Sequence, residues 1–539
     1  MLEKFRASAT PRKMLASLTA LVTALGPSVA PAYAAARPAT ATPIQHLVVI
    51  FQENVSFDHY FGTYPNATNP AGEPKFIARP GTPSVNGLAG ALLTNNPNLN
   101  PANGTGATNP FRLDRSQAVT ADQNHDYTAE QQAFDAGALD LFPEFVGTAG
   151  PPPPGGGVLS TNGLNLGYFD GNTVTAFWNY AQHFAMNDNS YSSTFGPSTV
   201  GLINLISGQT NGAVKTLNGT GDEVDGGAGS LTVIGDPDPI GDVCSNSTRN
   251  QVQMGGKNIG DLLTAANVSW GSFMGGFNLK KVNSNGTTGC SRSSTGLAGT
   301  TGDYIPHHAL FNYWPSTANP NHTRPRSLAE IGNSGPANHN YDLDDFVNAV
   351  RAGNFPAVNF IKMVAFQDGH AGYSDPLDEQ TAIVKLVNFL EEQPSWSNTA
   401  VVILYDDSDG WYDHQMGPIV NQSTGPADAL TGASACGTGG LSLPGIDPAN
   451  THALGRCGYG PRQPLVVVSP WSRENFVDHT VTDQSSVIHF IEDNWLAGQR
   501  IGGGSFDAVA NSISQMFDFS QVRADGILIL NPNTGEQIP

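Results

Sequence analysis

The feature that most constrains the fold is a short apolar run that ends at a carboxylate and an amide. Residues Leu47 to Phe51 are all apolar, and Glu53 and Asn54 follow after one further residue. A continuous apolar run of this length is typical of a strand that is buried on both faces of a parallel sheet. Ligands of such sheets bind beyond the carboxyl ends of the strands, so both polar side chains are candidate metal or phosphate ligands.

A second stretch repeats this arrangement about 350 residues later. The apolar run from Ala400 to Leu404 is followed by Asp406 and Asp407. Either polar pair alone is more often a turn or a helix cap. The two pairs together predict that two strands bring four oxygen ligands to one edge of a sheet.

The remaining apolar patterns predict an α/β fold with a large, mostly parallel central sheet and helices on both faces. Further strands are expected at 268–274, 358–363 and within 464–473, and helices at 174–185, 199–207, 340–352, 381–392 and 485–495. We expect one domain over 35–539 with three loop-rich insertions, at about 66–110, 208–258 and 415–460.

The first residues are typical of a signal peptide. Basic residues up to Lys13 precede an apolar run over 14–25, and Ala32-Tyr33-Ala34 offers small residues for cleavage after Ala34. Arg12-Lys13 is not a twin-arginine pair, which favours ordinary secretion to the periplasm or the outside. No later window is apolar enough for a membrane-spanning helix. The net charge of −21 argues against nucleic acid as a partner, and the oligomeric state is left open.

Four cysteines in an exported chain suit two disulfides. Three pairings are possible. The sequence neighbours, Cys244 with Cys290 and Cys436 with Cys457, are the most economical pairs because each closes one loop-rich insertion. A cysteine metal site is disfavoured because the chain has no Cys-x-x-Cys spacing.

One hydroxyl and several imidazoles are candidates for chemistry. Ser198 follows the turn Phe195-Gly196-Pro197 and opens a predicted helix, where the helix dipole favours an alkoxide or a phosphoryl group, although a simple N-cap fits the same pattern. His125 precedes a predicted helix with Thr128 as its candidate cap, His307 and His308 lie in a turn, and His370 follows a predicted strand. Taken alone, the first three could equally be surface residues.

Three segments together resemble a known family. ENVSFDHYFG at 53–62, FGPS at 195–198 and YDDSDGWYDH at 405–414 resemble the phosphoesterase family of bacterial acid phosphatases and phospholipases C, which belongs to the alkaline-phosphatase-like superfamily. The resemblance covers roughly 46–495. It implies that Ser198 is the nucleophile and that His308, His370 and His125 contact the transferring phosphoryl group.

The resemblance points first to the acid phosphatase branch. The segment after Ser198 lacks the Pro-Asn-Arg of the phospholipase pattern and has Val200, Gly201 and Leu202 instead, while the segment around His308 is similar to that of the phosphatases. We therefore expect a secreted acid phosphatase that acts on small phosphomonoesters through a phosphoserine. The alternatives are a phospholipase C and a non-catalytic binding protein on the same fold.

The chemistry of a phosphate ester calls for a cation near the hydroxyl. We expect one divalent ion of undetermined identity, with hard oxygen ligands. Its expected ligands are Glu53, Asn54, Ser198, Asp406 and Asp407. We expect His307, Asp413 and His414 to orient the groups that bind the ion and the substrate. Protonated histidines would give the enzyme an acid pH optimum.

Two other readings of these segments are disfavoured. A calcium loop with Gly410 at its sixth position would begin at Tyr405 and end at Met416, neither of which is a carboxylate. An α/β-hydrolase would need Gly-x-Ser-x-Gly, whereas Val200 follows Ser198 by two positions.

Overall fold

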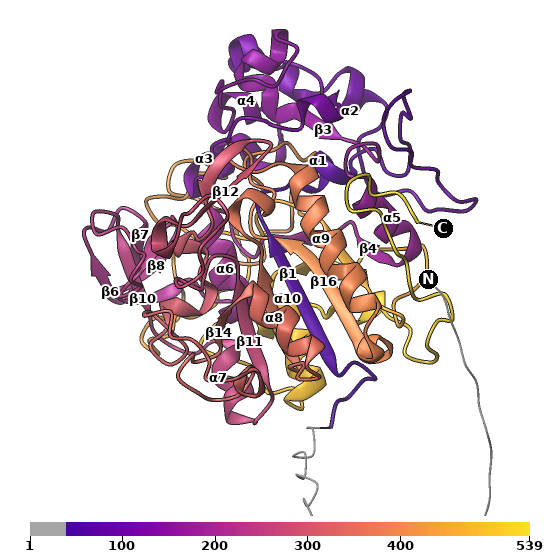
Figure 1. Cartoon of the computed structure of the whole chain (residues 1–539). Coiled ribbons are helices and arrows are strands. Elements are labelled where there is room, and N and C mark those ends of the chain that lie inside the picture. Colours follow the sequence, from indigo (N-terminus) through magenta and orange to yellow (C-terminus); the bar gives the residue numbers. More distant parts are fainter. Residues whose placement is uncertain (1–38, 539) are drawn as a thin grey trace, which may run out of the picture. The chain divides into compact units, whose positions relative to one another are not determined.

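The computed structural model describes residues 39–538 (Figure 1). The predicted signal peptide, 1–34, lies outside these residues. Within the part of the chain that is described, no helix is both long and apolar enough to cross a membrane. The assignment of one domain with three insertions stays a prediction.

An eight-stranded sheet forms the centre, in the order β14-β11-β15-β1-β16-β17-β4-β18. Its strands are β1 His46–Gln52, β4 Ala185–Asn187, β11 Trp270–Met274, β14 Asn340–Asp342, β15 Val358–Lys362, β16 Thr399–Tyr405, β17 Leu465–Val468 and β18 Phe476–Asp478. Only β17 runs against its neighbours; all other pairs are parallel. The predicted α/β fold with a mostly parallel sheet is confirmed.

Helices cover both faces of this sheet, as the alternation of side chains along β1 shows. Val48 and Ile50 belong to one core, and Leu47, Val49 and Phe51 belong to the other. The first core is covered by α5 Thr175–His183, α8 Leu343–Arg351 and α9 Pro376–Glu391. The second is covered by α6 Ser198–Ser207, α7 Ile259–Ala265 and α10 Ser485–Trp495. Both faces of β1 are therefore buried, as its apolar sequence predicts.

Local sequence signals fix several helix ends. Asp375 caps α9 through the backbone N–H groups of Leu377 and Asp378, and Pro376 occupies the first helical position. Gly208 ends α6 with φ of 57°, a left-handed conformation that glycine adopts without a steric penalty. The two helices lie on opposite faces of the sheet, since α9 packs in the first core and α6 in the second.

Two predicted details are wrong. Residues 340–342 form strand β14 instead of the start of a helix, because they pair with β11 and Asp342 then caps α8. The helix after His125 is α3 Tyr127–Phe134, so Thr128 lies inside it, and Asp126 holds the cap position. A short helix, α1 Phe57–Phe61, follows β1 directly.

The stretch 208–258 contains a second sheet, in the order β7-β8-β6-β10-β9. Its strands are β6 Asn211–Leu217, β7 Glu223–Gly227, β8 Ser230–Val233, β9 Asp238–Pro239 and β10 Gln251–Met254. The disulfides are Cys244–Cys290 and Cys436–Cys457, the pairing of sequence neighbours.

Smaller elements complete the described chain. Three two-stranded sheets pair β2 Phe111–Leu113 with β3 Gly167–Phe169, β5 Ser190–Tyr191 with β19 Thr482–Asp483, and β12 Ser293–Gly296 with β13 Gly299–Gly302. The short helices α2 Ala91–Thr94 and α4 Phe142–Phe145 lie in the connections.

Candidate active site

Three adjacent parallel strands deliver polar side chains to the same edge of the central sheet. β1 lies between β15 and β16. Figure 1 shows β1 in indigo and β16 in orange. The register aligns Gln52 with Tyr405, so Glu53 and Asp406 leave the sheet side by side. Both carboxylates, and that of Asp407, are fully buried. The structure thus brings together the two acidic segments that the sequence predicts to meet.

Helix α6 places Ser198 against these carboxylates. Ser198 Oγ lies 3.0 Å from Glu53 Oε2 and 3.2 Å from Asp407 Oδ2, and only 1% of the residue is exposed. A Cβ atom on Gly201 would lie 2.1 Å from the backbone oxygen of Asp406. Glycine at this position lets the first turn of α6 rest directly on the end of β16, which brings the hydroxyl within reach of Asp407.

Asn54 presents an unsatisfied oxygen to the same place. Its backbone N–H donates to Asp406 Oδ1 at 3.2 Å, and its side-chain nitrogen lies 3.4 Å from His125 Nε2. Asn54 Oδ1 is buried and, among the described residues, has no hydrogen-bond partner. A buried oxygen without a donor beside two carboxylates and a hydroxyl is what a hard cation would satisfy. The residues present therefore fit a divalent ion.

Sequence reasoning missed Lys362, the last residue of β15. Its ammonium forms an ion pair with Glu53 Oε1 and lies 3.4 Å from Asp406 Oδ2, and its side chain is 1% exposed. Lys362 gives the same signal as the acidic pairs, a charged residue at the end of an apolar strand. The prediction was limited to oxygen-bearing side chains, which left out the ammonium of Lys362.

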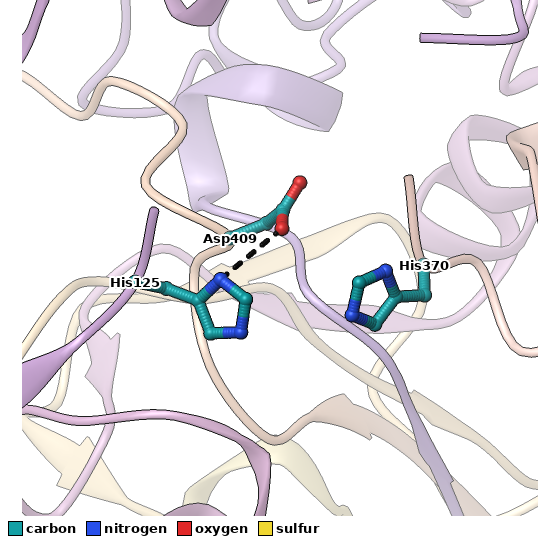
Figure 2. A group of neighbouring side chains, drawn as sticks. All are labelled: His125, His370 and Asp409. Atoms are coloured by element: carbon teal, nitrogen blue, oxygen red, sulfur yellow. Dashed lines mark ion pairs between the residues drawn. The ribbon is translucent and has the colours of Figure 1, made fainter. Parts of the chain in front are cut away.

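The predicted histidines surround Ser198 and its carboxylates. His308 Nδ1 lies 3.2 Å from Glu53 Oε1, and the His307 ring packs edge-on against the His308 ring. His125 Nδ1 lies 3.4 Å from Asp409 Oδ1, and the His125 ring meets that of His370 edge-to-face at 5.8 Å (Figure 2). All three predicted phosphoryl-binding imidazoles thus lie close to the acidic cluster.

The surroundings drive the imidazole pKa values apart. Burial lowers the pKa of His308 well below its usual value, and nearby His307 and His370 lower it further. Burial also lowers the pKa of His370. Burial alone would lower the pKa of His125 as well, but the carboxylates of Asp407 and Asp409 outweigh it and raise that pKa well above its usual value. Of the three imidazoles, His125 is the one whose surroundings favour the protonated form.

Burial acts on the carboxylates in the opposite direction. It raises the pKa of Asp407 well above its usual value, although His125 opposes the shift, and it raises the pKa of Asp406 against the effect of Lys362. It raises the pKa of Asp368, which follows β15, to about 8. Carboxylates that resist ionisation in this way lack sufficient positive charge around them.

Asp368, Asp409 and Asp236 were also missed. Asp368 forms a possible ligand group with Glu53 and His308, and Asp409 forms another with His125 and His370. Asp236 comes from the second sheet region and accepts the backbone N–H of Thr199 at 2.8 Å, at the start of α6. Asp409 belongs to the DDSDG segment, next to the predicted ligands Asp406 and Asp407, whereas no local pattern marks Asp236.

Asp413 and His414 lie in a separate buried group around Arg462. Arg462 Nε lies 3.1 Å from both oxygens of Asp413, and Arg462 Nη2 lies 3.1 Å from Asp58 Oδ1. His414 Nδ1 lies 2.6 Å from Asp58 Oδ2. The expected support of the metal ligands by Asp413 and His414 stays a prediction.

The comparison with protein families supports the same reading of these segments. The profile of the phosphoesterase family matches residues 44–497, which include every predicted site residue. The chain belongs to the phosphoesterase family. It is accordingly a hydrolase of phosphoric esters.

Individual phosphoesterase relatives are distant but cover most of the chain. Phospholipase C A of Mycobacterium tuberculosis is 24% identical over 495 residues, which are 90% of this chain and 79% of the relative. Non-hemolytic phospholipase C of Burkholderia pseudomallei is 24% identical over 520 residues, 93% of this chain and 63% of the relative. Non-specific phospholipase C6 of Arabidopsis thaliana is 23% identical over 451 residues, 81% of this chain and 63% of the relative.

Proposed function

We propose that this phosphoesterase cleaves its ester by transfer of the phosphoryl group to Ser198 and then to water. The observation that supports this most directly is the position of Ser198 Oγ, 3.0 Å from Glu53 and 3.2 Å from Asp407 at the start of α6. A serine hydroxyl is nearly all neutral in water and needs a base or a cation to become a nucleophile. Its carboxylate neighbours supply a place for both.

The steps balance as two substitutions at phosphorus. Ser198 Oγ passes its proton to Asp407 Oδ2, 3.2 Å away, and forms a bond to phosphorus while the bond from phosphorus to the leaving alcohol breaks. His125, whose raised pKa favours the protonated form, donates a proton to the leaving oxygen. Water then gives a proton to His125 and attacks the phosphoserine, and the bond from phosphorus to Ser198 Oγ breaks. Asp407 returns its proton to Oγ, which restores the hydroxyl as the phosphate product leaves. His308 and His370 are placed to orient the phosphoryl oxygens.

Glu53, Asn54, Asp407 and Ser198 would hold a divalent ion, with Asp406 beside them. When bound, such an ion would stabilise the alkoxide of Ser198 and neutralise charge on the phosphoryl oxygens. Glu53 and Asp407 accept hydrogen bonds from the Ser198 hydroxyl and so orient it, and Lys362 fixes the position of Glu53.

The names of the relatives favour phospholipid phosphodiesters as substrates, so phospholipase C is our first proposal. The leaving group would then be diacylglycerol, and the phosphorylated head group would pass through Ser198. Acid phosphatase activity is the second candidate. It is supported by Val200-Gly201-Leu202, which stand in place of the Pro-Asn-Arg of the phospholipase pattern. Gly201 is required for contact with β16, so this position carries no side chain that could bind a phospholipid head group.

A paired substrate assay distinguishes the two. Purified protein is given phosphatidylcholine vesicles and, separately, p-nitrophenyl phosphate, each with and without a chelator. Release of phosphocholine at a much higher kcat/KM than p-nitrophenol supports the phospholipase. The reverse ratio supports the phosphatase. If a chelator removes all bound metal and the turnover of both substrates stays unchanged, the proposed role of the cation is contradicted.

We also propose that the protein is exported, because two disulfides form readily only in an oxidising compartment. Cell fractionation followed by N-terminal sequencing tests this. Export predicts a mature chain that begins near Ala35, and an intact chain confined to the cytoplasm contradicts it.

A further inference from the structure

Lys362 is the fixed positive charge inside the acidic cluster. Among the described residues, no other Lys or Arg forms an ion pair with Glu53 or Asp406. The ammonium also lies 5.5 Å from the centre of the ring of Phe51 on β1. A buried ammonium in contact with two carboxylates is held in one place, unlike a surface lysine.

The oxygens of Glu53 divide this cluster into two halves. Oε2 faces Ser198 Oγ, as does Asp407 Oδ2. Oε1 faces Lys362 Nζ, as does Asp406 Oδ2. A carboxylate that directs one oxygen to each of two cations is the arrangement by which two-metal phosphatases hold their ions a few ångströms apart. Here the second position is occupied by an ammonium.

The half around Lys362 also has metal ligands of its own. The ligand atoms of Glu53, His308 and Asp368 all lie within 4.8 Å of one another, and the three residues are buried. Three protein ligands are enough for a catalytic divalent ion. Asp368 is fixed by the backbone N–H of His370 at 3.1 Å and by the Tyr373 hydroxyl at 3.2 Å. Lys362 pairs with one member of this trio, Glu53.

We propose that Lys362 takes the place of a second metal ion. Its ammonium neutralises Glu53 and Asp406, keeps divalent ions away from the Glu53–His308–Asp368 trio, and so limits the site to one ion, bound on the Ser198 side. This role rests on the proposed function, because it presumes the ion beside Ser198. Lys362 acts through Glu53 and is therefore a positioning residue.

Metal stoichiometry tests the proposal directly. Wild-type protein, Lys362→Met and Lys362→Arg are stripped by chelation, titrated with Mn²⁺ and, separately, Zn²⁺, passed over a desalting column and measured by atomic emission. We expect one ion per chain for the wild type and for Lys362→Arg. We expect two for Lys362→Met, because Glu53 and Asp406 then lack a cation. The matched control is Lys385→Met, whose side chain is exposed on α9 and whose stoichiometry should equal that of the wild type.

Each outcome decides the matter. Two ions in the wild type, or a stoichiometry in folded Lys362→Met that does not exceed the wild-type value, overturns the role of Lys362. Far-ultraviolet circular dichroism establishes folding, and if Lys362→Met does not fold, Lys362→Gln replaces it with the same expectation of two ions. Failure of the proposed function is distinguishable, because it shows as a wild type that binds no ion and turns over no phosphoric ester.

Discussion

Two buried polar clusters lie beyond the ends of β1 and β16, and the same two segments build both. One cluster holds Glu53, Asp406 and Asp407 around Ser198; the other holds Asp58 and Asp413 around Arg462. In the second cluster Arg462 contacts both carboxylates, and His414 contacts that of Asp58. In the first, carboxylates outnumber fixed cations and Asn54 Oδ1 has no partner among the described residues. The paired cluster is suited to hold the fold, and the unpaired one to bind a cation.

The largest effect should come from the unpaired cluster. We expect Ser198→Ala to lower turnover of the preferred ester at least about a thousandfold, because the nucleophile is lost. The fold should be unchanged, since Ser198 is not needed for the pairing of β1 with β16. Steady-state kinetics and acid-quench trapping of a labelled phosphoprotein measure this. Ser207→Ala, at the other end of α6, is the control; equal activity in both variants would end the covalent mechanism.

The paired cluster should show the opposite behaviour. Arg462→Met leaves Asp58 and Asp413 buried without their main cation, which should lower the free energy of unfolding by about 3–5 kcal/mol. Denaturant titration measures the loss, and metal content per folded chain should stay constant. Arg326→Met removes an arginine whose side chain is 77% exposed and should change stability by well under 1 kcal/mol. If folded Arg462→Met loses its ion, the two clusters are not independent.

A smaller change tests how the two segments are brought to Ser198. Gly201→Ala places a Cβ against the Asp406 backbone and should move the first turn of α6 away from β16. We expect a loss of about 1–3 kcal/mol in stability and of about a hundredfold in kcat/KM. Gly221→Ala is the control, because a Cβ there meets no atom within 4 Å. A folded Gly201→Ala with wild-type kinetics would show that this contact does not position the nucleophile.

The last effect depends on pH and concerns Glu379, a buried carboxyl on α9 that accepts hydrogen bonds from Tyr60 and Tyr405 at 2.8 Å. Burial raises the pKa of Glu379 from 4.5 to about 8. Between these values the folded state keeps a proton that the unfolded chain releases. The free energy of unfolding should therefore fall by about 1.4 kcal/mol per pH unit as pH rises from 4.5 to 8.

Glu379→Gln cannot ionise and should flatten this pH profile, as measured by denaturant titrations at several pH values. Glu392→Gln, on the exposed end of the same helix region, should leave the profile unchanged. A wild-type slope in Glu379→Gln would assign the pH dependence to other groups.

Much of the fold and half of the site follow from local sequence. Apolar runs at Leu47–Phe51 and Ala400–Leu404 predicted both central strands, and the polar residues after them predicted the acidic pairs. The strands β6 to β10 were missed because a stretch rich in Gly, Asp and Asn shows little hydrophobic alternation. Asp236 was missed for another reason, because no local pattern marks it. The partner of a buried charge can lie far away in the sequence. The residues around Asp413 therefore do not predict its ion pair with Arg462.

The alignment of Gln52 with Tyr405 has a consequence for tolerance to change. Backbone hydrogen bonds hold neighbouring strands about 4.8 Å apart, so the sheet itself sets the gap between the acidic ends of β1 and β16. A single inserted or deleted residue within β1 would send Glu53 to the opposite face of the sheet. Insertions in the connections that follow β1 and β16 leave this spacing unchanged. The surface that faces the substrate can therefore vary while the groups around phosphorus keep their positions.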